Sequence, residues 1–417
     1  MRSVALAALF ATSFVVFSFG GETYVIELVL LLGLLLAAAS GRLAAHPTKL
    51  GLWVTLLAVW ALSQFATDVV RLTSPLDMTK GFLRVLFLAT NLLAIARLTR
   101  GASDRLLAVS GGLALSGILG FVLLPNAYTA GEPWKFGLAY PLTLGAFTLT
   151  CLARSPVLKG IAVVAVPVLA LVDLLQGARS LFGITLAAAA LCIYHRFYRS
   201  KHKPRRAAFV VVALVVGTLA SSSAYAHLAS SGALGPKQAL KYASQSHGRY
   251  GAVLGGRPEF AYSFIVLSEN PVLGVGSYAQ LTTSLDLQAR TLLTSWGYRR
   301  GAQRADLSDR VPTHSGLLGS WVEGGLGAAF FWLALAALCL RILALGPRSA
   351  RLAPLQIYLA TGLVWDVMFS PYGADRRLTV AVSLLVLLCR DPARRPEALD
   401  PSPVTPTQPA ASLVRVP

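Results

Sequence analysis

His314 is the residue of this sequence best suited to proton transfer, because it stands where a long polar stretch gives way to an apolar segment. A histidine side chain titrates close to neutral pH and is the usual choice for taking a proton from a hydroxyl group. A histidine at such a boundary also occurs as a helix cap or as a hydrogen-bonded interfacial group, and the sequence leaves this alternative open. Glu323 follows nine residues later, about half a turn around an ideal helix, so we do not expect it to contact His314.

Three arginines in unusual positions are the second set of candidate residues. Arg179 lies between two apolar segments, Arg257 directly precedes a proline, and Arg376 begins another apolar segment together with Arg377. The planar guanidinium group matches phosphate oxygens in pairs and stays protonated. We therefore identify Arg179, Arg257 and Arg376 as candidate pyrophosphate ligands. Arg179 is equally compatible with contacts to lipid headgroups, and Asp375 is placed to neutralise one of the paired arginines.

Several other chemistries lack their motifs. The sequence has no external acidic cluster of the D-x-D kind, no phosphate-binding P-loop and no G-x-S-x-G turn. Its four cysteines all fall in or beside apolar segments, which is typical of small buried residues and not of a metal site. We expect neither a metal nor a cofactor.

The composition indicates a multi-spanning membrane protein. Of 417 residues, 55% are hydrophobic and 13% are charged, and the mean hydropathy is +0.64. Apolar segments of roughly 17 to 20 residues are long enough to cross a bilayer as helices. The sequence therefore predicts an all-α fold of about twelve transmembrane helices, at 4–20, 23–40, 50–67, 80–96, 106–125, 137–153, 158–175, 180–195, 207–226, 314–341, 353–370 and 376–390.

The distribution of lysine and arginine predicts the orientation of these spans. Net charge is +19, and the basic residues recur at alternate connections: 42–49, 97–105, 154–159, 196–206, 341–351 and 390–395. Cytoplasmic connections are rich in Lys and Arg, so both termini are expected in the cytoplasm. Residues 1–20 could instead be a signal peptide, but no clear cleavage site follows them, and we expect a retained first helix. A nucleic-acid partner is not expected, because no basic run is interleaved with aromatic residues.

Four regions follow from this reading: spans 1 to 9 in residues 1–226, a large outer loop in 227–313, spans 10 to 12 in 314–390, and a proline-rich disordered cytoplasmic tail in 391–417. Within the loop, Pro258 predicts the first turn of a helix that ends near Glu269. Glu323 and Asp366 are acids inside predicted spans and are expected to pair with buried polar groups.

Three short motifs fall on the predicted outer face. The first is the arginine-containing turn Gln176–Ser180. The second is Arg257–Phe260, which leads to Glu269–Gly276 with its Gly-Val-Gly ending. The third is His314–Ser315, followed by Glu323–Gly327. These motifs, which cover roughly residues 170 to 330, resemble those of the O-antigen ligase and polymerase family of bacterial multi-spanning enzymes. Glycine is absent eleven residues after Arg249 and after Arg257, which favours the ligase pattern over the polymerase pattern.

The resemblance implies an O-antigen ligase-like glycosyltransferase, inverting and metal-independent, in the bacterial inner membrane with its active site facing the periplasm. Its partners would be an undecaprenyl-pyrophosphate-linked glycan donor, a lipid A-core acceptor and membrane lipids. His314 would be the general base, and Arg179, Arg257 and Arg376 would bind the pyrophosphate. The alternatives are a polymerase of O-antigen or exopolysaccharide, or a protein O-oligosaccharyltransferase, in the same family. A secondary transporter is a further alternative, because intramembrane acids often mark ion pathways.

Overall fold

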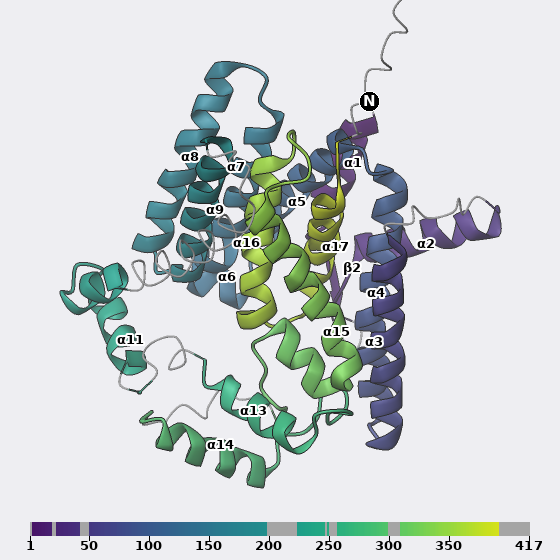
Figure 1. Ribbon diagram of the computed structural model, residues 1–417, viewed down its shortest axis with the longest axis vertical. Helices are drawn as coiled ribbons and strands as arrows, with labels where there is room; N and C mark the ends of the chain where they lie inside the picture. The colour runs from purple at the N-terminus through teal and green to yellow at the C-terminus, as the bar shows by residue number, and fades with distance from the viewer. Residues whose placement is uncertain are drawn as a thin grey trace, which may run out of the picture.

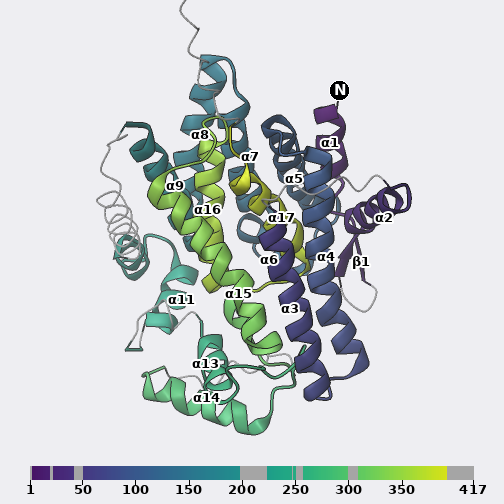
Figure 2. The same ribbon diagram turned by 45° about the vertical axis from the view of Figure 1, so that its right-hand side comes forward.

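A computed structural model describes residues 2–18, 22–41, 50–197, 223–246, 248–249, 257–298 and 309–391. Nearly all of its regular structure is helical, and the helices form a bundle with two shorter helices, α13 and α14, across one end (Figures 1 and 2). The first half contains α1 (Arg2–Ala11), α2 (Val25–Ala39), α3 (Gly51–Val70), α4 (Pro75–Thr99), α5 (Ser103–Leu123), α6 (Ala127–Gly131), the π-helix η2 (Pro133–Leu138), α7 (Ala139–Leu152) and α8 (Pro156–Leu175). The second half contains α9 (Arg179–Phe197), α11 (Pro236–Ser246), α13 (Glu259–Glu269), α14 (Thr283–Ser295), α15 (Gly316–Leu345), α16 (Ala353–Phe369) and α17 (Ala374–Leu388).

Apolar helices give the protein the character of an all-α membrane protein. Within the described ranges, five helices are long and apolar enough to cross a membrane, namely α3, α4, α5, α8 and α15. Three more, α1, α2 and α16, are apolar but shorter. The predicted number of twelve spans is therefore not confirmed. The predicted ninth span, 207–226, lies mostly outside the described residues, as do the basic connection 42–49 and the tail after residue 391.

The start of the chain differs from the predicted pair of spans. α1 ends at Ala11, and the antiparallel strands β1 (Val16–Ser18) and β2 (Glu22–Tyr24) follow it. In both ribbon views α2 projects sideways from the bundle instead of running along α4 (Figures 1 and 2). In its first turn, the buried Glu27 is bound by Asn91 of α4 and Arg377 of α17.

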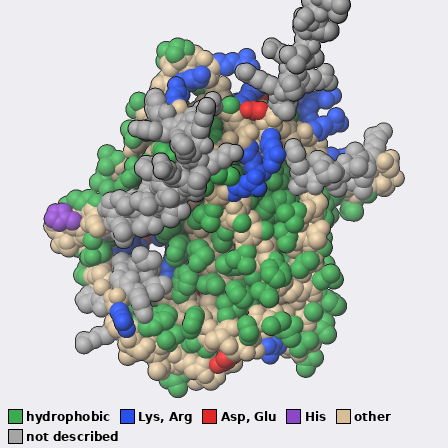
Figure 3. Space-filling model, viewed as in Figure 1, with side chains coloured by type: hydrophobic (Ala, Val, Ile, Leu, Met, Phe, Trp, Pro, Cys, Tyr) green, Lys and Arg blue, Asp and Glu red, His purple; other side chains and the backbone are tan. Residues whose placement is uncertain are grey.

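Charge and hydrophobicity are unevenly distributed over the surface. Lys and Arg side chains gather toward the end of the molecule where the chain begins, and hydrophobic side chains cover the middle (Figure 3). α13 and α14 lie at the opposite end (Figure 1). We call this opposite end the α13–α14 end.

α15 is broken near its first third, and the break positions the site described below. Gly325 has φ 72° and ψ −169°, a backbone conformation that favours glycine. A side chain there would collide with the carbonyl oxygen of Val272. The segment 272–276 repairs the interrupted helix: the amides of Val275 and Gly276 donate to the carbonyls of Val322 and Glu323 at 2.8 and 3.1 Å. The 272–276 segment is thus attached to the backbone of α15.

Candidate functional site

His314 lies at the α13–α14 end, two residues before α15 begins. The helix is capped by the next residue, because the Ser315 hydroxyl accepts the amide of Leu318 at 3.0 Å and donates to the carbonyl of Val367 at 2.8 Å. The cap considered for His314 from the sequence therefore belongs to Ser315. The His314 side chain is 41% exposed, which leaves part of the imidazole accessible from solvent.

Glu259, in the first turn of α13, is the nearest acid to this imidazole. Its Oε1 lies 3.6 Å from Nδ1 of His314, and its side chain is only 16% exposed. Nδ1 of His314 and Oε2 of Glu259 are both buried and, among the described residues, have no hydrogen-bond partner. A small approach would form an Nδ1–H···O bond, which would leave Nε2 as the basic nitrogen. The pair has the arrangement of a base and the carboxylate that orients it.

Both ends of α13 are held in place. At its start, the ring of Phe260 packs against that of Phe369 at the end of α16, with centroids 5.8 Å apart. Beyond its end, the indole of Trp321 on α15 donates to the carbonyl of Pro271 at 2.6 Å. The helix predicted from Pro258 is confirmed, with Pro258 as its N-cap residue. Glu259 is therefore presented to His314 by a fixed element.

Arg257 and Arg179 lie close enough for their charges to interact. Burial lowers the pKa of Arg257, the Arg179 guanidinium lowers it further, and the carboxylate of Glu259 opposes both effects. Arg179 is the first residue of α9, and its guanidinium lies 4.5 Å from the ring centre of Tyr225. Two neighbouring guanidinium groups repel each other, so a bound anion would relieve the repulsion.

Arg376 does not join this group. Its Nη1 lies 3.1 Å from Asp366 and its Nε lies 3.4 Å from Asp375, so two carboxylates occupy its guanidinium. The contacts that the structure gives Arg376 include none with Arg179, Arg257 or His314. The predicted convergence of Arg376 with the other two arginines is therefore not seen. Asp366, as expected for an intramembrane acid, is paired within the bundle.

Arg377 is used in the core of the bundle. It donates to both carboxylate oxygens of Glu27, at 2.9 and 2.6 Å, and to the carbonyl of Glu22 at 2.9 Å. Both side chains of the pair are buried. This arginine anchors α17 to the first turn of α2.

Glu323 is likewise paired, with a residue that the sequence reasoning missed. Its carboxylate contacts Arg84 of α4 in a mostly buried ion pair. Nearby, Asp68 of α3 accepts the backbone amide and the hydroxyl of Ser277 at 2.6 and 2.7 Å. The ion pair joins α15 to α4, and the Asp68 contacts fix the segment after α13 against α3. Asp68 and Arg84 are charged residues in or at the edge of apolar segments, a signal that could have identified them.

No protein-family model, curated protein or solved structure matches this chain. Its function is therefore argued from the geometry of the site and from the motifs of the sequence. Within the described residues, no group of three or more His, Cys, Asp or Glu side chains is placed to hold a metal ion.

Glu259 is the functional candidate that sequence reasoning did not select. It lies 55 residues before His314, and only the folded chain brings the two together. The available signal was its position next to Pro258, which places its carboxylate in the first turn of a helix and beside Arg257.

Proposed function

We propose that this protein is a glycosyltransferase of the O-antigen ligase type. It moves a polysaccharide from undecaprenyl pyrophosphate to a sugar of lipid A-core, and its α13–α14 end faces the periplasm of a bacterial inner membrane. The observation that carries the proposal is the pairing of the partly exposed His314 with Glu259, beside Arg257, whose charge interacts with those of Glu259 and Arg179. The gathering of Lys and Arg at the opposite end supports this orientation.

The reaction fits these residues step by step. Nε2 of His314 takes the proton of an acceptor hydroxyl while its oxygen attacks the anomeric carbon of the donor sugar. The bond from that carbon to the pyrophosphate oxygen breaks, the anomeric centre inverts, and undecaprenyl pyrophosphate leaves with the electron pair. Arg179 and Arg257 hold the negative charge of the leaving group. Glu259 stabilises the imidazolium that forms and keeps Nε2 directed toward the acceptor.

The transporter alternative receives less support from the structure. Glu323 and Asp366, the two acids that suggested an ion pathway, are each paired with an arginine. The carbonyls of Glu323 and Gly324 at the break in α15 accept hydrogen bonds from the Gly276 amide and the Ser63 hydroxyl. In transporters, such freed carbonyls bind the transported ion. Here the protein satisfies them itself.

Analysis of the cell envelope tests the proposed function. Deletion of the gene is expected to leave bare lipid A-core, with polymerised glycan accumulating on undecaprenyl pyrophosphate, and mass spectrometry of both lipids measures this. Only short glycans on the lipid carrier would indicate a polymerase instead. Loss of glycan from proteins, with normal lipopolysaccharide, would indicate a protein oligosaccharyltransferase.

Replacing Glu259 by glutamine is expected to slow transfer by about 10- to 100-fold, within the range that a positioned general base contributes. The glutamine keeps the shape of the side chain but no longer stabilises the imidazolium. We therefore also expect the rate to reach its half-maximal value at a lower pH than in the wild type. Initial rates of transfer measured from pH 5 to 9 with purified protein test both effects.

The matched control is Asp309→Asn, the same chemical change at an exposed acid of the same outer connection. It is expected to keep the wild-type rate and pH profile. An unchanged pH profile in Glu259→Gln would show that Glu259 does not act on His314.

A further inference from the structure

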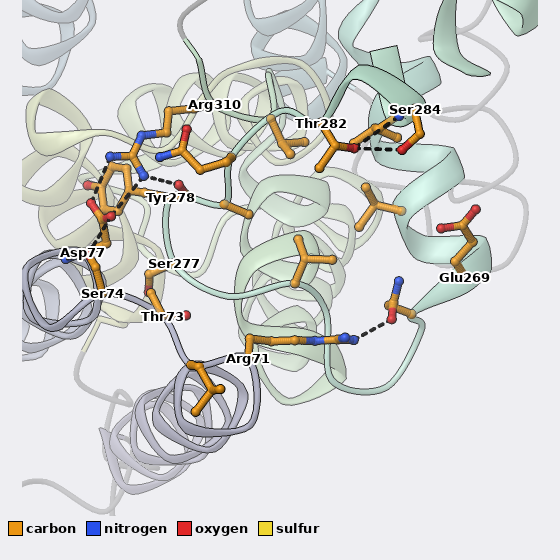
Figure 4. Close-up of a pocket in the computed structure, with 18 of the residues that line it drawn as sticks. Arg71, Thr73, Ser74, Asp77, Glu269, Ser277, Tyr278, Thr282, Ser284 and Arg310 are labelled. Carbon is orange, nitrogen blue, oxygen red and sulfur yellow. Dashed lines mark hydrogen bonds and ion pairs between the residues drawn. The ribbon is translucent and has the colours of Figure 1, made fainter. Parts of the chain in front are cut away.

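A second site lies at the other end of α13. A pocket of about 490 Å³ is enclosed by the turn between α3 and α4, the segment after α13, and α14 (Figure 4). Its volume is in the range of ligand sites. Glu269 and Asn270, at the end of α13, line it, whereas His314 and Glu259 do not. Val266 is the lining residue of α13 that is closest to Glu259 in the chain, and it lies about 10 Å along the helix from Glu259, since a helix rises about 1.5 Å per residue.

The lining contains both polar and apolar side chains, and its charges are balanced. Two arginines, Arg71 and Arg310, are matched by two carboxylates, Asp77 and Glu269. Arg310 donates to both oxygens of Asp77, at 3.0 and 3.1 Å. This balance contrasts with the neighbouring charges of Arg179 and Arg257. A phosphate would have to displace the Asp77 carboxylate from Arg310, or the Asn270 amide oxygen from Arg71, so the pattern favours a neutral ligand.

Hydroxyl and amide side chains make up much of the remaining lining. In Figure 4, Thr282 and Ser284 of the α14 region lie across the pocket from Arg310 and Tyr278. The amides of Asn270 and Gln288 also line the pocket. Such groups donate and accept hydrogen bonds at the same time, as sugar hydroxyls do. A pocket of this chemistry matches a carbohydrate better than an apolar or an ionic ligand.

The backbone of the pocket wall is in a costly conformation. In the described part of the chain, three residues other than glycine have a positive φ, and two of them, Leu72 at 52° and Tyr278 at 52°, line this pocket. Such conformations are unfavourable for residues other than glycine and cluster at functional sites. The neighbouring contacts hold them: the amide of Thr73 donates to the carbonyl of Asp68 at 2.9 Å, and Ser277 is bound by the Asp68 carboxylate.

We propose that this pocket binds part of a glycan chain, away from the sugar that reacts. The proposal rests on the proposed function, because it assigns the pocket to the polysaccharide that the enzyme transfers. Contacts to a remote part of a substrate supply binding energy without taking part in the chemistry. The pocket therefore selects for glycans long enough to reach from His314 to Gln288.

Direct binding tests the pocket independently of catalysis. The probe is the polysaccharide cleaved by mild acid from the lipopolysaccharide of the strain that carries the gene, and binding to the full-length protein in detergent is measured by saturation-transfer NMR. Gln288→Trp fills the pocket from an exposed position on α14. The control is Leu287→Trp, at the adjacent residue, which is 65% exposed and does not line the pocket.

The wild type and Leu287→Trp are expected to bind the polysaccharide, and Gln288→Trp to bind it at least about tenfold more weakly, with an unchanged melting temperature. In transfer assays, Gln288→Trp should raise KM for a long donor about tenfold but leave the rate with a single-repeat donor unchanged. Equal binding by Gln288→Trp and wild type, or competition by inorganic phosphate, would overturn the proposal.

The two proposals fail separately. One outcome is that the wild type binds the polysaccharide and Gln288→Trp does not, but neither protein transfers glycan. This would support glycan binding in the pocket and contradict the glycosyltransferase function. The other outcome is that both proteins transfer glycan and have the same KM for a long donor. This would support the glycosyltransferase function and contradict glycan binding in the pocket.

Discussion

His314→Ala is expected to abolish glycan transfer, a loss of at least about 10²- to 10⁴-fold, the contribution of a positioned general base. The variant should remain inserted and folded, because the side chain is partly exposed and Ser315 caps α15 without it. Transfer from purified lipid-linked glycan to lipid A-core, with the melting temperature in detergent as a second measurement, checks both statements.

His227→Ala is the matched control for this experiment. It makes the same change at an exposed histidine of the 227–313 connection, where the Ser230 hydroxyl donates to the backbone carbonyl of His227 and not to its imidazole. It is expected to transfer glycan at the wild-type rate. A wild-type rate of transfer by His314→Ala would show that His314 is not the general base, whatever effect substitutions of the arginines have.

Arg377→Leu is expected to destabilise the protein strongly. The change leaves the carboxylate of Glu27 buried without its cation, and breaking a buried ion pair in this way costs about 3 to 5 kcal/mol. The melting temperature in detergent and the yield of folded protein from the membrane measure the effect. Arg376→Leu should cost less, because the Arg376 side chain is 32% exposed.

The double variant Glu27→Leu/Arg377→Leu separates a structural role from a functional one. Replacing both charges by apolar groups of similar size is often neutral or stabilising, so most of the lost stability should return. The restored protein should also transfer glycan. A single Arg377→Leu variant that stays fully stable but fails to transfer would instead place Arg377 in the site.

The local structure around the site follows from sequence signals that act over a few residues. Pro258 begins α13 and Asn270–Pro271 ends it, as the fixed φ of proline and its missing amide dictate. His314 was expected at the mouth of an apolar helix and lies two residues before α15. These predictions depend on neighbours in the chain, which a sequence displays directly.

Contacts between distant segments were beyond such reasoning. Glu259 and His314 meet only because Phe260 packs on Phe369 and Trp321 binds Pro271. The pairing of Glu27 with Arg377 joins residues 350 positions apart, and α2 projects sideways from the bundle. Hydropathy measures how apolar a segment is, but it does not give the direction of the helix or the partner of a buried charge.

The break in α15 has a mechanical consequence for the proposed reaction. The segment that repairs the break follows α13, which carries Glu259, and His314 lies just before α15, so both residues are tied to the first turns of α15. A tilt of those turns would carry His314 and Glu259 together and preserve their separation. Arg179 belongs to α9, outside this unit, so such a tilt would change the distance between His314 and Arg179. In the proposed reaction, this is the distance that a sugar bound between the two residues must match.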